Sequence, residues 1–321
     1  MTDKLPTYGG QAVLEGVMMR GSQAMAVAVR DPKGEIQIQV QRLSNIYRGR
    51  ISKLPFLRGL LGLWDALGLG MQSLNFSASV AAGEDSKAIS ESPVMMGTML
   101  LSLAFGVTLF FVAPAAAGAG IEYVLQNVLG LSMTATSGWL GNLAEGAIRL
   151  CLIVGYIWAI GLIPDIRRLY GYHGAEHKTI NAFESGAPLT PESVARFPLE
   201  HPRCGTAFLL VVVVFSVLLF SLLGPLPLWL RLLSRIVLVP VLAAIAYEYL
   251  RFTARYISNP LVRLLVIPNL AMQRLTTREP DRGMLEVAIR AFEEMRQREV
   301  EKSQTSEVLG EPRVRTSSEV P

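Results

Sequence analysis

All three histidines of the chain fall between residues 165 and 205. His173 and His177 are four positions apart, with Glu176 between them. Residues four apart share one face of a helix, so both imidazoles could bind one metal ion while Glu176 orients a water molecule beside it. The order H-x-x-E-H reverses the zinc-protease signature, in which two histidines hold zinc and a glutamate is the general base. The pattern therefore predicts a metal centre with Glu176 as its catalytic residue.

A second pair of possible ligands, His201 and Cys204, lies three positions apart in the same segment. In a reducing cytoplasm the thiol stays available as the thiolate that binds zinc. Four ligands, His173, His177, His201 and Cys204, would close a tetrahedral shell and make the site structural, whereas three ligands plus water would make it catalytic. The sequence leaves both arrangements open, and it also allows a surface loop with unrelated histidines.

Three further polar residues could contact a ligand or the substrate. Glu184 lies on the face of His173 and His177 but about 10 Å further along the helix axis. Arg203 lies within the second ligand pair. Glu248 falls near the end of an apolar segment, where a carboxylate is costly unless it is paired or functional; pairing with Arg251 or solvation at the interface is the simpler interpretation.

The composition predicts that these residues belong to a membrane protein. Of 321 residues, 51% are hydrophobic and 17% charged, against a soluble average of about 25% charged. No basic stripe with interleaved aromatics indicates nucleic-acid binding, so the predicted partner is the lipid bilayer. Two cysteines make no disulfide framework, and Cys151 reads as a packing residue. The first residues lack the pattern of a cleavable signal peptide.

Four segments are apolar over roughly the 20 residues that a membrane crossing needs. They span residues 94–117, 143–164, 206–223 and 232–250. Within the second, Glu145 and Arg149 are four apart and can neutralise each other. We therefore expect an α-helical integral membrane protein with about four transmembrane helices in a domain over residues 94–250, which includes the histidine-rich loop 165–205.

Basic residues predict the orientation of these helices. The region before the first helix is rich in Lys and Arg, whereas residues 118–142 contain none. Because cytoplasmic loops carry the excess of Lys and Arg, both termini and the loop 165–205 should be cytoplasmic, in a multi-pass protein of the plasma membrane.

The flanking regions are predicted to be cytoplasmic. Residues 1–90 should form a small α+β region, because residues 25–40 alternate apolar and polar around the turn at 31–34. Residues 54–74 read as an interfacial or packing helix, or as a re-entrant segment. Residues 251–300 should hold an interfacial segment and an amphipathic helix that Asp281 caps, with an apolar face of Leu285, Ala288, Ile289, Phe292 and Met295. Residues 301–321 read as a disordered tail.

Four strings, at 9–21, 172–184, 201–208 and 275–281, together resemble the YqhQ-like family of bacterial membrane proteins, domain of unknown function 1385. The similarity runs from about residue 8 to residue 292. It implies a metal-dependent enzyme in the membrane, with no reaction specified. Its motif residues here would be Glu176 and the residues of the two ligand pairs, with Glu15 and Arg20 in the first string. Without the resemblance, those two residues read as ordinary polar groups in a Gly-rich loop.

Three functions follow as hypotheses. The first is a metal-dependent enzyme, a hydrolase, with a divalent metal, zinc, held at the cytoplasmic membrane face. The second is a membrane scaffold or assembly protein whose metal site is structural. Metal transport is a weaker third, because transporters place ionisable residues at the membrane midplane, and here Glu145, Arg149, Arg235 and Glu248 lie towards the ends of the predicted helices.

Overall fold

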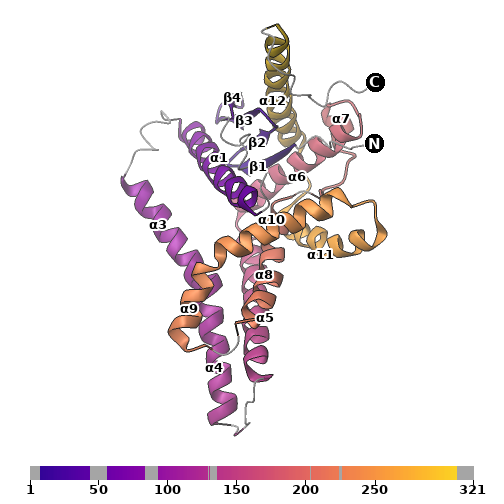
Figure 1. The fold of residues 1–321 in the computed structure, drawn as a ribbon. Coiled ribbons are helices and arrows are strands. Elements are labelled where there is room, and N and C mark those ends of the chain that lie inside the picture. Colours follow the sequence, from indigo (N-terminus) through magenta and orange to yellow (C-terminus); the bar gives the residue numbers. More distant parts are fainter. Residues whose placement is uncertain are drawn as a thin grey trace.

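The computed structural model describes residues 8–43, 56–83, 93–128, 130, 136–202, 204–223 and 226–308. Two parts are visible in Figure 1: a layered region around a small sheet, and a set of long helices that extend away from it. The described residues are mostly helical, as the sequence predicts.

Four antiparallel strands form one sheet in the order β1-β2-β3-β4. Strands β3 (Ala24–Arg30) and β4 (Ile36–Arg42) form the predicted hairpin, whose turn is held by the Asp31 carboxylate. Its Oδ1 accepts the N–H groups of Lys33 and Glu35 at 2.9 Å each, and Gly34 supplies the positive φ that the turn requires.

The interpretation of residues 9–21 as a Gly-rich loop was wrong. They form the hairpin of β1 (Gly9–Val13) and β2 (Gly16–Arg20), joined by Leu14 and Glu15. Glu15 has a φ of 51°, a left-handed conformation that costs a non-glycine residue roughly 1–3 kcal/mol. A strand is usually recognised by alternating apolar and polar side chains, and the glycines of this segment interrupt that alternation because they have no side chain.

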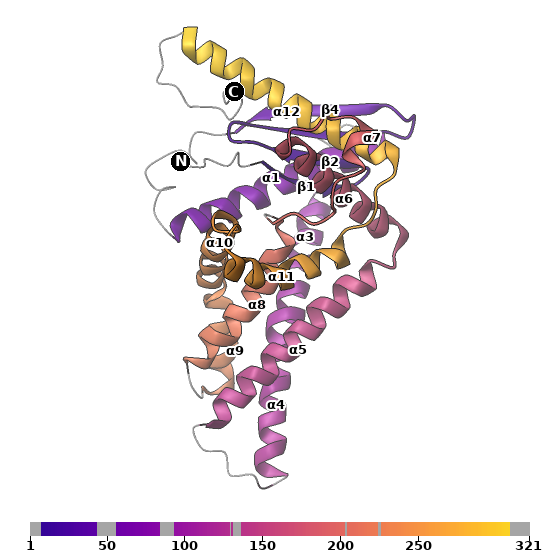
Figure 2. The ribbon, with the colours of Figure 1, turned by 90° about the vertical axis from the view of Figure 1, so that its right-hand side faces the viewer.

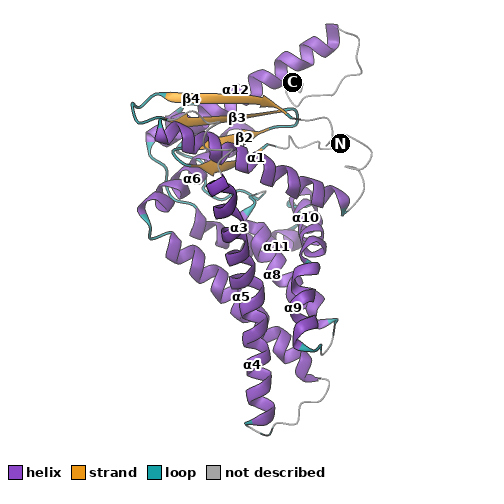
Figure 3. Ribbon diagram, turned by 90° about the vertical axis from the view of Figure 1, so that its left-hand side faces the viewer, coloured by secondary structure: helices purple, strands orange, loops and turns teal. Residues whose placement is uncertain are grey.

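Helices cover both faces of the sheet. On one face, α12 (Arg282–Val308) packs against β2 and β3, and α6 (Pro164–Glu184) packs against β1 and β2. On the other, α1 (Leu57–Ala82) buries Leu69 against Met18 and Val27 and continues toward α10, as Figure 3 shows. Residues 57–74 thus belong to one continuous helix that packs against the sheet.

The prediction for α12 is confirmed. Leu285, Ala288, Ile289, Phe292 and Met295 are all buried against the sheet and α6. Asp281 Oδ1 accepts the N–H of Met284 at 2.8 Å, which is the predicted cap. The helix runs to Val308, past the predicted start of the tail at residue 301, and residues 309–321 lie outside the described part of the chain.

The long helices include two that are long and apolar enough to cross a membrane, Leu100–Asn127 and Gly141–Ile160. The first combines α3 (Pro93–Val107), a π-helix (η3, Thr108–Val112) and α4 (Ala113–Asn127); the second lies in α5 (Thr136–Ile160). A third arises if α9 (Leu228–Val237) and α10 (Val239–Arg255), which meet at 46°, count as one span.

The predicted third span, residues 206–223, corresponds to α8 (Thr206–Ser221). Its 16 residues rise about 24 Å at 1.5 Å per residue, less than the roughly 30 Å of a hydrocarbon core. Length and composition of the described helices thus support two or three crossings. Beyond them, α11 (Pro260–Thr276) packs against α8 and leads back to the sheet region, and α7 (Pro191–Val194) is a single turn.

Three charged side chains inside the long helices, Glu145, Arg149 and Arg235, form one network. Glu145 of α5 accepts hydrogen bonds from Arg149 at 2.7 Å, as predicted, and also from Arg235 of α9 at 2.8 and 2.6 Å. The side chains of all three are at most 2% exposed. Arg149 Nε also donates to the carbonyl of Phe110 in the π-helix at 2.9 Å. The network therefore ties α5 to α9 and to the π-helix.

Candidate metal centre

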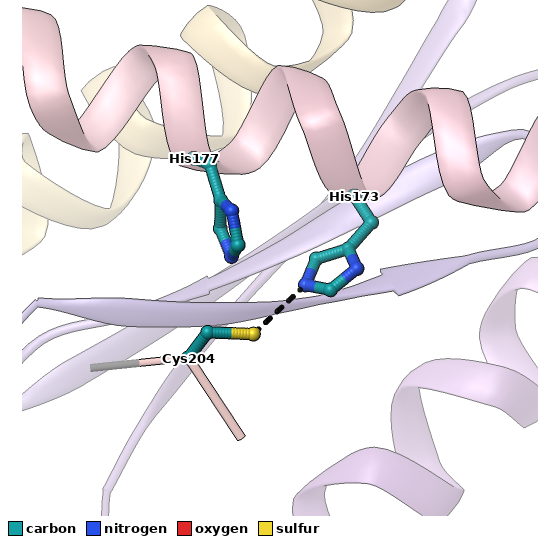
Figure 4. A group of neighbouring side chains, drawn as sticks. All are labelled: His173, His177 and Cys204. Carbon is teal, nitrogen blue, oxygen red and sulfur yellow. Dashed lines mark hydrogen bonds between the residues drawn. The ribbon is translucent and has the colours of Figure 1, made fainter. Parts of the chain in front are cut away.

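Helix α6 and the segment before α8 bring three possible metal ligands together. His173 and His177 project from one face of α6 toward the Cys204 sulfur, as Figure 4 shows. One ligand atom from each of the three lies within 4.8 Å of the others, and His173 Nε2 is 3.3 Å from Cys204 Sγ. Imidazole nitrogen and thiolate sulfur are the donors that zinc prefers.

Backbone carbonyls fix the orientation of both imidazoles. Nδ1 of His173 donates to the carbonyl of Thr276 at 2.9 Å, and Nδ1 of His177 donates to the carbonyl of Leu199. A carbonyl only accepts, so each Nδ1 carries the proton and each Nε2 keeps its lone pair for a metal. Nε2 of His177 is buried and has no hydrogen-bond partner among the described residues, a cost that a metal ligand bond would remove.

Cys204 lies just before α8, which begins at Thr206. Its Sγ accepts the N–H of Thr206 at 3.4 Å and contacts the Thr206 hydroxyl at 3.3 Å. These two contacts hold the sulfur on the side of the segment that faces His173.

His201 lies beside this group of three. Its ring centroid is 5.7 Å from that of His177, and its Nε2 is 3.7 Å from Oε2 of Glu184. Gln273 of α11 holds its backbone, with its side-chain amide bonded to the His201 N–H at 2.9 Å and to the His201 carbonyl at 2.8 Å. Ligation by His201 stays a prediction, and Glu184 faces His201.

Glu176 is buried against the first strand. Its carboxylate accepts the backbone N–H of Gly10, and its Oε2 has no hydrogen-bond partner among the described residues. A Cβ at Gly10 would lie 2.9 Å from the Glu176 carboxyl carbon and 2.5 Å from the Met18 carbonyl, so only glycine fits this contact. Burial raises the pKa of Glu176, while positive charge on His173 or His201 lowers it.

Burial lowers the pKa of both His177 and His201 below the ordinary value of 6.5. These imidazoles are therefore neutral at pH 7, which is the protonation state that binds a metal. The site is ready to take up a cation without first releasing protons from them.

The two residues that the resemblance added make ion pairs elsewhere. Glu15 accepts from Arg168 of α6 at 2.7 and 2.6 Å and from the Tyr172 hydroxyl at 3.2 Å. Arg20 pairs with the buried Asp65 of α1. Glu15 thus joins the β1–β2 turn to α6, and Arg20 joins β2 to α1, so both fix the layers that hold the metal centre.

The remaining predicted residues lie outside the group of three. Glu248 pairs with Arg58 of α1 at 2.6 Å and accepts the N–H of Phe56 at 3.2 Å, so the expected pairing with Arg251 was wrong about the partner. The sequence separation of 190 between Glu248 and Arg58 put this pair beyond any local pattern. Arg203 lies outside the described residues.

The chain matches, over residues 54–298, the family described as Protein of unknown function (DUF1385). The chain belongs to the DUF1385 family. It is similar to the Uncharacterized protein YqhQ of Bacillus subtilis (strain 168), with 36% identity over 300 residues that cover 90% of this chain and 92% of the relative. No solved structure matches the chain. The family description names no activity, so the candidate metal centre is the best guide to the chemistry of this DUF1385 protein.

Several residues that support the candidate metal centre were not predicted. The carbonyls of Leu199 and Thr276 hold the imidazoles, Gln273 holds His201, and Gly10 admits Glu176. Because every residue has a backbone carbonyl, the sequence does not indicate which carbonyl will hold an imidazole. The one available signal was the string 275–281, which includes Thr276 and could have been placed near the histidines.

Proposed function

We propose that this DUF1385 protein is a membrane-embedded, metal-dependent enzyme of the hydrolase type, with its centre at the cytoplasmic membrane face. The observation that carries the proposal is the group of His173, His177 and Cys204 with both Nδ1 atoms held by backbone carbonyls. Three protein ligands leave the fourth position of a tetrahedral ion open, which is the arrangement of catalytic zinc sites.

The residues present fit a divalent metal, and zinc in particular. The donor set is two imidazoles and one thiolate, and the orphaned Nε2 of His177 is aimed into the site. When bound, the ion would supply Lewis-acid chemistry to a polar bond of the substrate. Glu176 would accept a proton from the attacking water, the role that the glutamate has in related signatures.

Substitution of Glu176 tests the catalytic part of this proposal. We expect Glu176→Gln to keep the bound metal but to lower hydrolysis of ester, phosphoester or peptide substrates by about 10²–10⁴-fold, the usual contribution of a general base. The measurement is a substrate screen on detergent-purified protein with metal content determined in parallel. Glu35→Gln, in the exposed β3–β4 turn, is the matched control. Equal rates for wild type and Glu176→Gln would contradict the role of Glu176.

We also propose that the chain crosses the plasma membrane four times, with α8 and the α9–α10 pair as the third and fourth crossings and both termini cytoplasmic. The absence of Lys and Arg from residues 118–142 supports this orientation. The short α8 packs against α5, α10 and α11, which would help it cross despite its length.

Reporter fusions test this topology. We expect an exported reporter such as alkaline phosphatase to be active after Gly130 and after residue 226, and inactive after Gly186 or at the C-terminus. Cytoplasmic fluorescent fusions should show the reverse pattern. An active exported reporter at Gly186 would place the histidines on the wrong side and contradict the proposal.

One observation favours a structural site as a second candidate. The His201 ring is 5.7 Å from the His177 ring, so a modest shift would add a fourth ligand and close the shell. The metal would then hold α6 and the segment before α8 together. That is the structural role proposed for the metal in a membrane scaffold. Loss of structure on chelation would favour this candidate, because metal binding and folding are coupled at structural sites.

A further inference from the structure

The end of α10 and the whole of α11 carry positive charge without any acidic residue. Residues 249–278 contain Arg251, Arg255, Arg263, Arg274 and Arg278, but neither Asp nor Glu. Arg274 pairs with Glu200 at 3.1 Å, Arg278 donates to backbone carbonyls, and the Arg255 guanidinium lies 5.6 Å from the centroid of the Tyr256 ring. The side chains of Arg251, Arg255 and Arg263 are exposed and form no ion pair with the described residues.

Large apolar side chains are exposed next to these three arginines. Phe252 is 50% exposed and Tyr256 46%, and on α11 Leu261 is 74% and Leu264 64% exposed. The opposite side of α11 buries Val262 and Val266 against the rest of the protein. The α10–α11 unit therefore has one face packed on the protein and another that combines guanidinium groups with apolar groups.

The position of this unit matches a membrane surface. Figure 2 shows α11 lying across the ends of the long helices, between them and the sheet region. A helix at that level with apolar side chains on its outer face is typical of an interfacial helix, whose apolar groups enter the acyl boundary while its arginines reach the headgroups.

We propose that Arg251, Arg255 and Arg263 form a binding site for anionic phospholipid of the leaflet that faces the sheet region. The lipid phosphate would accept hydrogen bonds from the guanidinium groups, and the acyl chains would lie along Leu261 and Leu264. A soluble phosphate would gain nothing from the exposed apolar side chains, whereas a phospholipid uses both halves of the surface. This proposal does not depend on the metal centre.

Lipid binding by the full chain in detergent tests the site. The probes are dioctanoyl phosphatidylglycerol, dioctanoyl phosphatidylcholine and inorganic phosphate, with affinity measured by thermophoresis. Each arginine near an anionic surface contributes roughly fivefold, so wild type should prefer the anionic lipid by on the order of 100-fold. Substitution of all three arginines by Gln should abolish the preference, while substitution by Lys should keep most of it.

A matched control removes the same charge elsewhere. Arg196, Arg282 and Arg290 are exposed near the sheet and α12, and their triple Gln variant should keep the preference for anionic lipid. Circular dichroism identifies any variant that fails to fold, and the Lys variant then decides. Equal affinity for the two lipids in wild type, or an affinity for inorganic phosphate as high as for phosphatidylglycerol, would overturn the proposal.

Discussion

Elemental analysis of the detergent-purified protein should find about one zinc per chain. The zinc should be lost from each of the variants His173→Ala, His177→Ala and Cys204→Ala. The three ligand atoms lie within 4.8 Å of one another, so each substitution removes a third of the donor set. Even the loss of a group that only orients a ligand lowers metal affinity by about 10–100-fold, and the loss of a ligand should cost more. Cys151→Ala, in α5, controls for loss of a thiol and should keep the metal.

The variant His201→Ala then separates the two candidate functions. If the site is catalytic, this variant should keep its metal, and chelation should leave the unfolding temperature of the wild type nearly unchanged. If the site is structural, His201→Ala should lose metal and chelation should melt the region around the sheet. Wild type that binds no divalent metal at any tested concentration would contradict both.

Substitution of Glu145 by Ala should destabilise the protein by about 3–5 kcal/mol, the cost of leaving a buried charge without its partner. Glu145 accepts hydrogen bonds from both Arg149 and Arg235, and no other described carboxylate pairs with either arginine. Thermal unfolding in detergent is the measurement. Glu192→Ala removes a carboxylate that is 60% exposed and paired with Arg282, and should cost at most about 1 kcal/mol.

A compensated variant strengthens this test. Replacing Glu145, Arg149 and Arg235 together by Met removes every charge of the trio, and such replacements of buried ion groups are often neutral or stabilising. The triple variant should therefore be more stable than Glu145→Ala. If Glu145→Ala unfolded at the wild-type temperature, the network would not hold α5 to α9.

Local patterns predicted what depends on neighbours in sequence. The β3–β4 hairpin, the buried face of α12 and the Glu145–Arg149 pair all follow from spacings of a few residues. The juxtaposition of His173 and His177 belongs to the same class, because residues four apart lie on one face of a helix. Cys204 could also be predicted from the sequence as a ligand, because its residue type and its position in the same loop both indicated one.

What the sequence left open depends on groups that meet only after folding. Arg58 and Glu248, or Gly10 and Glu176, come from opposite parts of the chain and share no pattern. The number of crossings was uncertain for a different reason. Hydropathy marks where the chain is apolar, but the bend between α9 and α10 and the shortness of α8 are set by packing.

The sheet that is covered on both faces also sets an order of events during biosynthesis. Strands β1 to β4 leave the ribosome well before α12, which covers one of their faces. At roughly 5–20 residues per second, translation from β4 to α12 takes on the order of 10–50 seconds. Throughout that interval the apolar side chains of β2 and β3 lack their final cover while the long apolar helices are being synthesised. We therefore expect a chaperone or the membrane surface to cover the apolar face of the nascent sheet until α12 is made.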